Sequence, residues 1–333
     1  PTPALRAPHA TLARRPTSRN PAARTPSAHP SAAPMPIDRF YVILNPTAGR
    51  GAAARVRGIV ERGMAQAGAT FTIAETARRG HAAQLAEAAA RDGWPAVVAV
   101  GGDGTVHEVV NGLMRAAGGG ASVPLGIVGV GSGNDFAKLA GVPNDAAAAV
   151  RRMTEAEPRA VDVGRVGDEW FSNGVGIGLD ARVAIEVDRR RRFRGLAMYL
   201  HALAGVLRAF RPPHMTVELD GERVAEGPMT LVTIGNGGRH GGGFWICPDA
   251  KIDDGVMDMC VCTELGTLGI LWFLPQVMRG THTGARCVRM HRGTRVRVTS
   301  PDPLPVHADG EIIADDAREL IIELHPGRLR VLA

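Results

Sequence analysis

Three glycine-rich segments carry most of the residues in this chain that could do chemistry. They read Asn45-Pro-Thr-Ala-Gly-Arg-Gly51, Gly101-Gly-Asp-Gly-Thr-Val-His-Glu108 and Gly131-Ser-Gly-Asn-Asp-Phe136, and each follows an apolar run and precedes a helical pattern. Glycines let backbone amides approach phosphate oxygens closely, and the N-terminus of a following helix favours negative charge. Together the segments predict a site for a phosphate-bearing ligand, although any one of them alone could be an ordinary strand-to-helix turn.

Two acids inside these segments indicate a metal ion. Asp103 and Asp135 would repel a phosphate unless a cation lay between them, and hard oxygen ligands suit Mg²⁺. Taken singly, Asp135 could instead cap a helix and Asp103 could close a turn. The only lysines are Lys138 and Lys251, and no G-x-x-x-x-G-K-[ST] segment occurs, which argues against a P-loop NTPase.

The elements that position these segments change character along the chain. From Asp38 to about Ala160, short apolar runs alternate with helical patterns, which predicts a mostly parallel sheet covered on both faces. In such a sheet, ligands bind beyond the carboxyl ends of the strands, where all three glycine segments are expected. From Val161 onward, short alternating runs separated by Gly, Asp-Gly and Pro predict antiparallel strands, interrupted by helices at 194–210 and 267–278.

The predicted fold is therefore an N-terminal nucleotide-binding α/β domain with a mostly parallel sheet, followed by a C-terminal β-sandwich-like domain. We expect a disordered tail at 1–36, the α/β domain at 37–160 and the β-rich, acceptor-binding domain at 161–311. Short strands at 312–313, 320–324 and 329–332 are expected in the last segment, 312–333, which could complete the first domain.

Charge and composition exclude several classes of protein. The formal net charge is +6, but residues 1–36 contain five arginines and no acid, so the remaining 297 residues carry only +1 and no nucleic-acid surface is expected. The four cysteines lack metal-ligand or disulfide spacing, which favours a reducing cytoplasm. The longest apolar stretch, 265–278, is shorter than the roughly 20 residues of a membrane-spanning helix. We interpret the tail as an over-extended start ahead of Met35, with a targeting peptide as the alternative.

With their order and flanking residues, the three segments resemble the diacylglycerol kinase catalytic-domain family, which includes sphingosine kinases and bacterial soluble lipid kinases. A Gly-Gly-Asp-Gly-Thr box alone is shared with NAD kinases and phosphofructokinases, whereas the boxes at 45–51 and 131–137 are particular to the lipid kinases. The resemblance extends from about Phe40 to the C-terminus.

The resemblance implies an ATP site and an Mg²⁺ network. Asp103 and Asp135 would join Asp162 in a network of water and Mg²⁺ around the phosphates. Ala48 stands where serine is frequent and Ser132 where threonine is common, so one hydroxyl contact is in doubt and the other is kept. The residues expected to contact ATP are Asn45, Pro46, Thr47, Ala48, Gly49, Thr76, Gly102, Asp103, Gly104, Thr105, Val106, His107, Glu108 and Ser132.

Two further segments gain roles from the resemblance. His307-Ala-Asp-Gly-Glu311 is similar to an acidic motif linked to deprotonating the acceptor hydroxyl, so Asp309 and Glu311 join Asp103 as candidate catalytic acids; either Asp309 or Glu311 could be the base. From the residues alone, Asp309-Gly310 is typical of a hairpin turn. Asp254, with the carbonyls of Lys251 and Val256, resembles a structural Mg²⁺ site, and the alternative is a plain Asp-Gly turn.

The expected function is an ATP- and Mg²⁺-dependent lipid kinase that phosphorylates a lipid hydroxyl, with diacylglycerol or a related lipid alcohol as acceptor. The alternatives are a kinase of a soluble acceptor such as NAD and a non-catalytic nucleotide-binding regulator. Arg189–Arg192 with Arg194, next to an apolar helical segment, could dock transiently on an anionic membrane surface, or could be a solvated face leading into a buried helix. We therefore expect a cytoplasmic, peripherally membrane-associated protein that binds no nucleic acid, with a homodimer as an open alternative.

Overall fold

The structure is a computed structural model that describes residues 37–189 and 196–333. The tail predicted at 1–36 and most of the basic run at 189–194 lie outside the described residues. No helix of the described part is long and apolar enough to cross a membrane.

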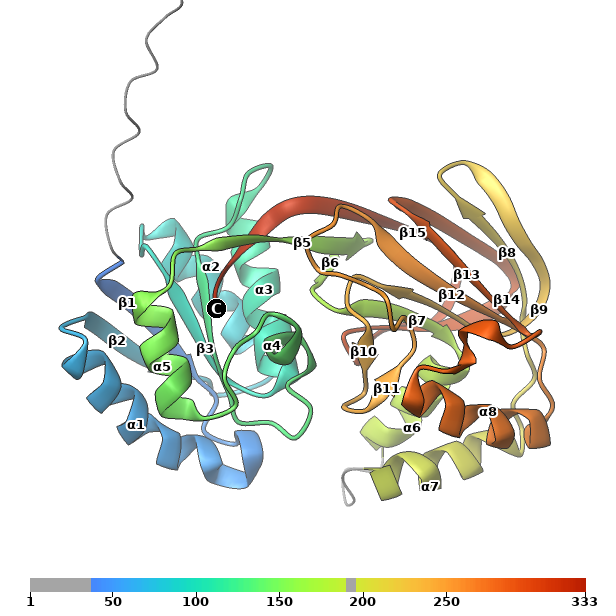
Figure 1. Cartoon of the computed structure of the whole chain (residues 1–333), viewed down its shortest axis with the longest axis horizontal. Coiled ribbons are helices and arrows are strands. Elements are labelled where there is room, and N and C mark those ends of the chain that lie inside the picture. Colours follow the sequence, from blue (N-terminus) through green and yellow to red (C-terminus); the bar gives the residue numbers. More distant parts are fainter. Residues whose placement is uncertain (1–36, 190–195) are drawn as a thin grey trace, which may run out of the picture. The chain divides into compact units, whose positions relative to one another are not determined.

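The first part of the chain forms the predicted parallel α/β arrangement. Strands β2, β1, β3 and β4 lie side by side in that order and pair in parallel. Helix α1 packs against α5 and α2 packs against α3 (Figure 1). Every residue of β3 is buried, as expected for a central strand between two helical layers. The bounds are β1 Arg39–Leu44, the 3-10 turn η1 Ala48–Gly51, α1 Ala52–Gln66, β2 Thr70–Glu75, α2 His81–Arg91, β3 Val97–Gly101, α3 Asp103–Ala117, β4 Leu125–Gly129, α4 Asp135–Leu139 and α5 Ala146–Glu155.

The second part is the predicted antiparallel β structure. Strands β13, β12, β9, β7 and β14 are consecutive neighbours. Side chains of β12, β9, β7 and β14 contribute to a separate apolar core, whereas Val288 of β13 packs in another cluster with residues of α8. Helices α6, α7 and part of α8 share a smaller apolar cluster. The bounds are β5 Arg159–Val166, β6 Glu169–Phe171, β7 Gly174–Gly178, α6 Leu179–Arg189, α7 Leu196–Leu207, β8 His214–Leu219, β9 Glu222–Gly235, β10 Arg239–His240, β11 Phe244–Trp245, β12 Met257–Thr263, α8 Thr267–Arg279, the 3-10 turn η2 His282–Gly284, β13 Val288–Gly293 and β14 Arg295–Ala308.

The last strand, β15 (Glu311–Leu332), joins the two parts. It pairs with β14 and β5 in antiparallel fashion, and its end pairs in parallel with β4 through Val331 and Leu332 (Figure 1). The sequence predicted three short strands here instead of one strand of 22 residues. Polar residues and Pro326 interrupt the apolar pattern, but register shifts in the pairings with β14 and β5 absorb these interruptions.

A tight turn between β14 and β15 places the acidic motif. Asp309 and Gly310 form a two-residue connection with φ of 52° and 88°, and Ala308 pairs with Glu311 across it. Positive φ at both turn residues matches the right-handed twist of a hairpin, and Asp-Gly is a favoured pair for it. The motif is therefore a hairpin turn, in which Asp309 is a turn residue and Glu311 is the first residue of β15.

Candidate active site

The three glycine segments meet beyond the carboxyl ends of β1, β3 and β4. The Asn45 side-chain amide donates a hydrogen bond of 3.0 Å to Thr105 Oγ1, which joins the first segment to the second. The backbone N–H groups of Asn134 and Asp135 donate to the Asp103 carboxylate at 2.8 and 2.7 Å, which joins the second to the third. The predicted convergence of the three segments is thus present in the structure.

Glycine is required where these segments touch. A Cβ on Gly49 would lie 2.3 Å from the Val130 carbonyl oxygen, and φ of 58° at Gly49 disfavours other residues as well. A Cβ on Gly131 would lie 2.9 Å from Gly102 Cα. Backbone therefore packs directly on backbone at both positions, which leaves no room for a side chain there.

The Asp103 and Asp135 carboxylates lie close enough to affect each other. Burial and the Asp135 charge raise the pKa of Asp103, against the two backbone donors that lower it. Asp135 accepts a hydrogen bond from Gly242 N at 2.7 Å, and Arg239 Nε lies 3.7 Å from its Oδ1. That Oδ1 atom is buried and has no hydrogen-bond partner. The pair concentrates negative charge where a cation would be favourable.

Asp162 is tied to other turns. Its carboxylate accepts hydrogen bonds from Gly255 N at 2.7 Å and Gly327 N at 2.8 Å, and its own N–H donates to the Ile252 carbonyl. Asp162 is almost fully buried. It therefore connects the turn before β12 to the irregular point in β15, and its membership of a water and Mg²⁺ network with Asp103 stays a prediction.

The segment around Asp254 forms an Asp-Gly turn, with φ of 77° at Gly255. The Asp254 carboxylate pairs with Arg292 and accepts a hydrogen bond from Val256 N at 3.4 Å. Lys251 is exposed. An arginine thus occupies the position facing Asp254, and a structural Mg²⁺ held by this turn stays a prediction.

Asp309 is a buried acid whose carboxylate is held by several hydrogen bonds from protein groups. Its carboxylate accepts hydrogen bonds from the backbone N–H groups of Ser172, Asn173 and Gly174, each at 2.9 Å, and contacts Ser172 Oγ at 3.2 Å. Burial alone would raise the pKa of Asp309, but His107 and the backbone donors outweigh it and lower the pKa. Asp309 therefore remains a carboxylate whose lone pairs are already engaged.

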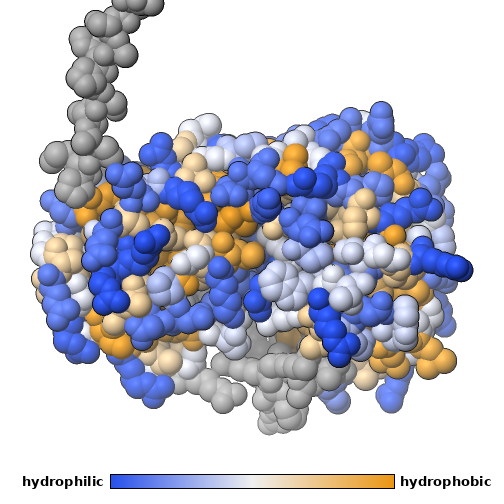
Figure 2. All heavy atoms as spheres, viewed as in Figure 1, coloured by the Kyte–Doolittle hydropathy of each residue, from blue (hydrophilic) through white to orange (hydrophobic). Residues whose placement is uncertain are grey.

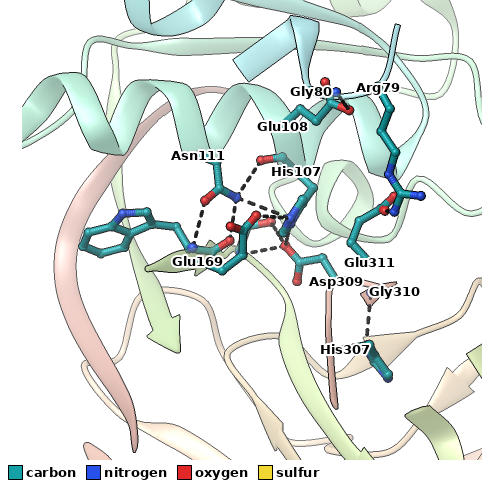
Figure 3. Close-up of polar contacts among 12 residues, drawn as sticks. Arg79, Gly80, His107, Glu108, Asn111, Glu169, His307, Asp309, Gly310 and Glu311 are labelled. Atoms are coloured by element: carbon teal, nitrogen blue, oxygen red, sulfur yellow. Dashed lines mark hydrogen bonds and ion pairs between the residues drawn. The ribbon is translucent and has the colours of Figure 1, made fainter. Parts of the chain in front are cut away.

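His107 is the partner that sequence reasoning did not assign to Asp309. Its Nδ1 lies 3.2 Å from Asp309 Oδ2 and its Nε2 lies 2.9 Å from Glu169 Oε1 (Figure 3). Burial lowers the pKa of His107, yet hydrogen bonds and charges from Asp309 and Glu169 prevail and raise it to about 9. His107 is thus a buried imidazolium between two carboxylates.

Helix α3 holds His107 in this place. Asn111, one turn later on the same face, exchanges hydrogen bonds of 2.8 and 2.9 Å with the Trp170 backbone and donates to the His107 carbonyl. In the sequence, the i, i+4 spacing of His107 and Asn111 predicts that both lie on one face of a helix. That spacing does not indicate that His107 contacts Asp309 or Glu169. The His107 side chain points toward Asp309 and Glu169 (Figure 3).

Glu311 lies on the other side of the turn, beside the second glycine segment. It pairs with Arg79 (Figure 3). Its Oε1 would be 2.9 Å from a Cβ on Gly104 in the first turn of α3. About a third of its side chain is exposed. Unlike Asp309, Glu311 therefore presents a carboxylate that a bound molecule can reach.

The remaining predicted residues surround this centre. Thr76 follows β2 and donates its N–H to the Leu44 carbonyl, while Ser132 is exposed in the third segment. Glu108 accepts hydrogen bonds from Gly80 N and Ala82 N at 2.7 and 3.0 Å, so its side chain holds the start of α2. Pro46, Thr47 and Ala48 lie in the first glycine segment. Val106 is buried on α3. Whether these residues contact ATP stays a prediction.

Comparison with known proteins assigns both parts of the chain to a family. Residues 39–166 match the diacylglycerol kinase catalytic domain, and residues 173–333 match the YegS C-terminal NAD kinase beta sandwich-like domain. A diacylglycerol kinase of Mycobacterium tuberculosis is 30% identical over 303 residues, covering 89% of this chain and 95% of that protein. A probable lipid kinase YegS-like protein of Chromohalobacter salexigens is 34% identical over 250 residues, covering 74% and 79% of the two chains.

A solved structure agrees with these relatives. The crystal structure of a putative diacylglycerol kinase from Bacillus anthracis superposes with a TM-score of 0.74 at 26% identity, covering 89% of this chain and 97% of that one. Both the α/β part and the β-sandwich-like part predicted from the sequence are thus confirmed. The chain belongs to the diacylglycerol kinase catalytic-domain family and is a phosphotransferase with an alcohol group as acceptor.

Proposed function

We propose that this protein is an ATP- and Mg²⁺-dependent lipid kinase that transfers the γ-phosphoryl group to a hydroxyl of diacylglycerol or a related lipid alcohol. The observation that carries the proposal is the position of Glu311, whose accessible carboxylate lies against the first turn of α3 at the meeting point of the glycine segments. A proton acceptor and a phosphate-binding loop are thereby adjacent, as phosphoryl transfer to an alcohol requires.

The glycine segments would hold the nucleotide phosphates. The N-terminus of α3 follows Gly102 directly, so its first amides are unpaired within the helix and favour an anion. Asn45 and Thr105, joined by a hydrogen bond, would fix the first segment beside them. These contacts are electrostatic and positional, and they suit a reaction in which most of the catalysis is positioning.

The residues present fit a divalent cation held jointly with phosphate. Asp135 Oδ1 accepts no hydrogen bond and has the Arg239 guanidinium only at 3.7 Å, and the pKa of Asp103 is raised, so a cation bound closer to both carboxylates would be favourable. Among the described residues, no group of three or more His, Cys, Asp or Glu side chains is placed to hold a metal ion, so phosphate oxygens and water would complete the coordination. Mg²⁺ bound there would neutralise charge on the phosphates.

Glu311 is the better candidate for the base, and Asp309 for a positioning residue. Asp309 has a lowered pKa and accepts three backbone N–H groups, so it is a weak proton acceptor without room for a new donor. Glu311 is exposed in part and follows Asp309 across the tight turn. Asp309 would hold the turn to the backbone of 172–174, and the turn would hold Glu311.

In the proposed reaction, the acceptor hydroxyl gives its proton to the Glu311 carboxylate as its oxygen bonds to the γ-phosphorus. The bond from that phosphorus to the β,γ-bridging oxygen breaks, and ADP leaves with the electron pair. The proton on Glu311 then passes to solvent, which its partial exposure allows. We further propose that the enzyme works in the cytoplasm, where ATP is available, and collects its acceptor from a membrane surface.

Radiolabelled ATP incubated with the purified full chain tests the proposal. Parallel reactions contain a total lipid extract, diacylglycerol in mixed micelles, or NAD, each with Mg²⁺ or with a chelator. We expect a labelled lipid only when Mg²⁺ is present, and identification of the product names the alcohol. Labelled NADP in place of a labelled lipid, or no product from any acceptor, would refute the lipid kinase.

Substitution at the hairpin tests the assignment of the base. Glu311→Gln should keep ATP binding and lower transfer by about 10²- to 10⁴-fold, the usual contribution of a general base. Glu319→Gln is the matched control, because Glu319 lies on the same strand and is also paired with an arginine, Arg297. Normal turnover in Glu311→Gln would show that another group accepts the proton.

A further inference from the structure

Helix α8 presents an apolar face to solvent. Among the described residues, the large hydrophobic side chains that are exposed are Leu268, Leu271, Trp272 and Ile321, and three of these four lie on α8. Leu268 is 82% exposed and Trp272 is 65% exposed. Single exposed apolar residues are common on proteins, but a cluster on one helix marks an interaction surface.

The exposed residues form one stripe. At about 100° per residue, Leu268, Leu271, Trp272, Pro275 and Arg279 fall within an arc of about 100°. All five are exposed. The stripe therefore ends in a cation on an otherwise apolar surface.

The opposite side of α8 is anchored in the protein. Ile270, Phe273 and Val277 are buried, and the Phe273 ring makes an edge contact with buried His282 at a centroid distance of 5.5 Å. Since both sides of the helix are apolar and only one is packed, the exposed stripe is not explained by the core. Its composition is typical of a helix face that contacts a second apolar environment.

The charge around α8 indicates what covers the stripe. From Leu265 to Gly293 the chain contains four arginines and no acid. Arg292 pairs with Asp254 and Asp258, whereas Arg279, Arg286 and Arg289 are exposed. An exposed tryptophan and an exposed arginine, Arg279, on the same face of an apolar helix suit the boundary between acyl chains and anionic headgroups.

We propose that the exposed face of α8 docks on an anionic lipid surface. Leu268, Leu271 and Trp272 enter the acyl boundary, and Arg279 remains at the level of the headgroups. Figure 2 shows hydrophobic residues gathered at the lower right, over the position of α8 in Figure 1. This inference rests on the proposed function, because a kinase of a lipid alcohol must collect its acceptor from a bilayer.

A second copy of the chain fits the stripe less well. A symmetric pair would place the same patch on both partners, so the acid-free arginine segment of one copy would approach that of the other. Like charges brought together in this way oppose association, whereas an anionic bilayer attracts them. Charge complementarity therefore favours the lipid.

Vesicle co-sedimentation of the full chain tests the docking. The probes are phosphatidylcholine vesicles with and without phosphatidylglycerol. The variant combines Leu268→Ser, Leu271→Ser and Trp272→Ser, and Ile321→Ser on β15 is the matched control because Ile321 is the remaining exposed large hydrophobic residue of the described part. We expect wild type and control to bind the anionic vesicles, and the triple variant to bind at least about tenfold more weakly at an unchanged melting temperature.

Tryptophan fluorescence gives a second measurement at the same site. Of the four tryptophans, Trp272 is the exposed one, so its emission should shift to shorter wavelength when anionic vesicles are added. The conservative Trp272→Phe variant should keep binding while losing the shift. Equal vesicle binding by wild type and the triple variant, or no Trp272-dependent shift, would overturn the proposal.

The remaining outcomes separate docking from catalysis. Loss of phosphorylation on vesicles but not in detergent micelles by the triple variant supports docking. Binding that depends on α8 while no acceptor is ever phosphorylated leaves docking standing and refutes the proposed function. A dimer of wild type that the triple variant dissociates in sedimentation velocity, without lipid binding by either, would overturn docking in favour of a second copy.

Discussion

Replacing His107 with Asn removes a buried positive charge between Asp309 and Glu169 while keeping a polar side chain of similar reach. In the folded protein the pKa of His107 rises from 6.5 to about 9. Each pKa unit is worth about 1.4 kcal/mol, so the protonated form adds about 3 kcal/mol to the free energy of unfolding. Because the folded pKa is the higher one, this contribution is complete below pH 6.5 and is lost as the pH rises through about 9.

The prediction is measured by urea denaturation of wild type and His107→Asn between about pH 6 and pH 9.5. Wild type should lose about 3 kcal/mol more stability than the variant over this interval, since all other groups titrate in both proteins. His214→Asn is the control, because His214 is exposed and its backbone N–H, which the substitution keeps, donates to Asp302. Its curve should parallel that of wild type.

If the free energy of unfolding varied with pH in the same way for wild type and His107→Asn, the buried imidazolium would be refuted. An NMR titration in which the His107 ring protons respond with a midpoint below 7 would also refute it, because Asp309 and Glu169 would then not be holding the proton. If the reasoning is right, the variant should also lose phosphoryl transfer more steeply than ATP binding, since Asp309 positions the turn that carries Glu311.

Three other predictions concern packing, geometry and thiols. Gly176→Ala places a Cβ 2.2 Å from Asp180 Oδ2 and should lower the free energy of unfolding by about 1–3 kcal/mol in urea denaturation. Gly104→Ala places a Cβ 2.9 Å from Glu311 Oε1 and should lower turnover about tenfold without lowering the melting temperature, as measured by kinase assay and thermal melting. Ellman's reagent should modify only Cys287 in the native protein, because the other three cysteines are buried and burial raises their thiol pKa values.

Each of these predictions has a result that contradicts it. Gly284→Ala is the control, because no atom lies within 4 Å of the new Cβ, and it should leave the free energy of unfolding unchanged. An equally unchanged free energy of unfolding for Gly176→Ala would contradict the packing prediction. Unchanged turnover of Gly104→Ala would show that the position of Glu311 beside the first turn of α3 does not matter for catalysis. Rapid modification of a second native thiol would show that the buried cysteines open to solvent.

The sequence predicted the features that depend on local pattern. Alternation of apolar runs and helical spacing identified the α/β part, and continuous runs such as 96–100 marked buried strands, because burial and helical periodicity act over a few residues. The Asp309-Gly310 hairpin was also predictable, since its φ angles favour those two residues. What pattern could not show is that this ordinary turn lies inside the site.

The long-range features were not predictable in the same way. β15 continues through Pro326 because its pairing with β5 shifts register between His325 and Leu329, and such pairings join residues far apart in the chain. His107 meets Asp309 across 202 positions, and Arg79 meets Glu311 across 232. No local spacing encodes these contacts, since they exist only once β14 and β15 lie beside α3.

The sequence by itself determined the family, the order of the three glycine segments and the set of acids available for chemistry, because these are properties of residue type and short spacing. Only the tertiary structure decided the state of each acid. It buried Asp309 against three amides and an imidazolium, left Glu311 accessible beside Gly104 and tied Asp162 to other turns. The physical reason is that the protonation and reach of a carboxylate depend on desolvation and on its partners, and both are set by the fold.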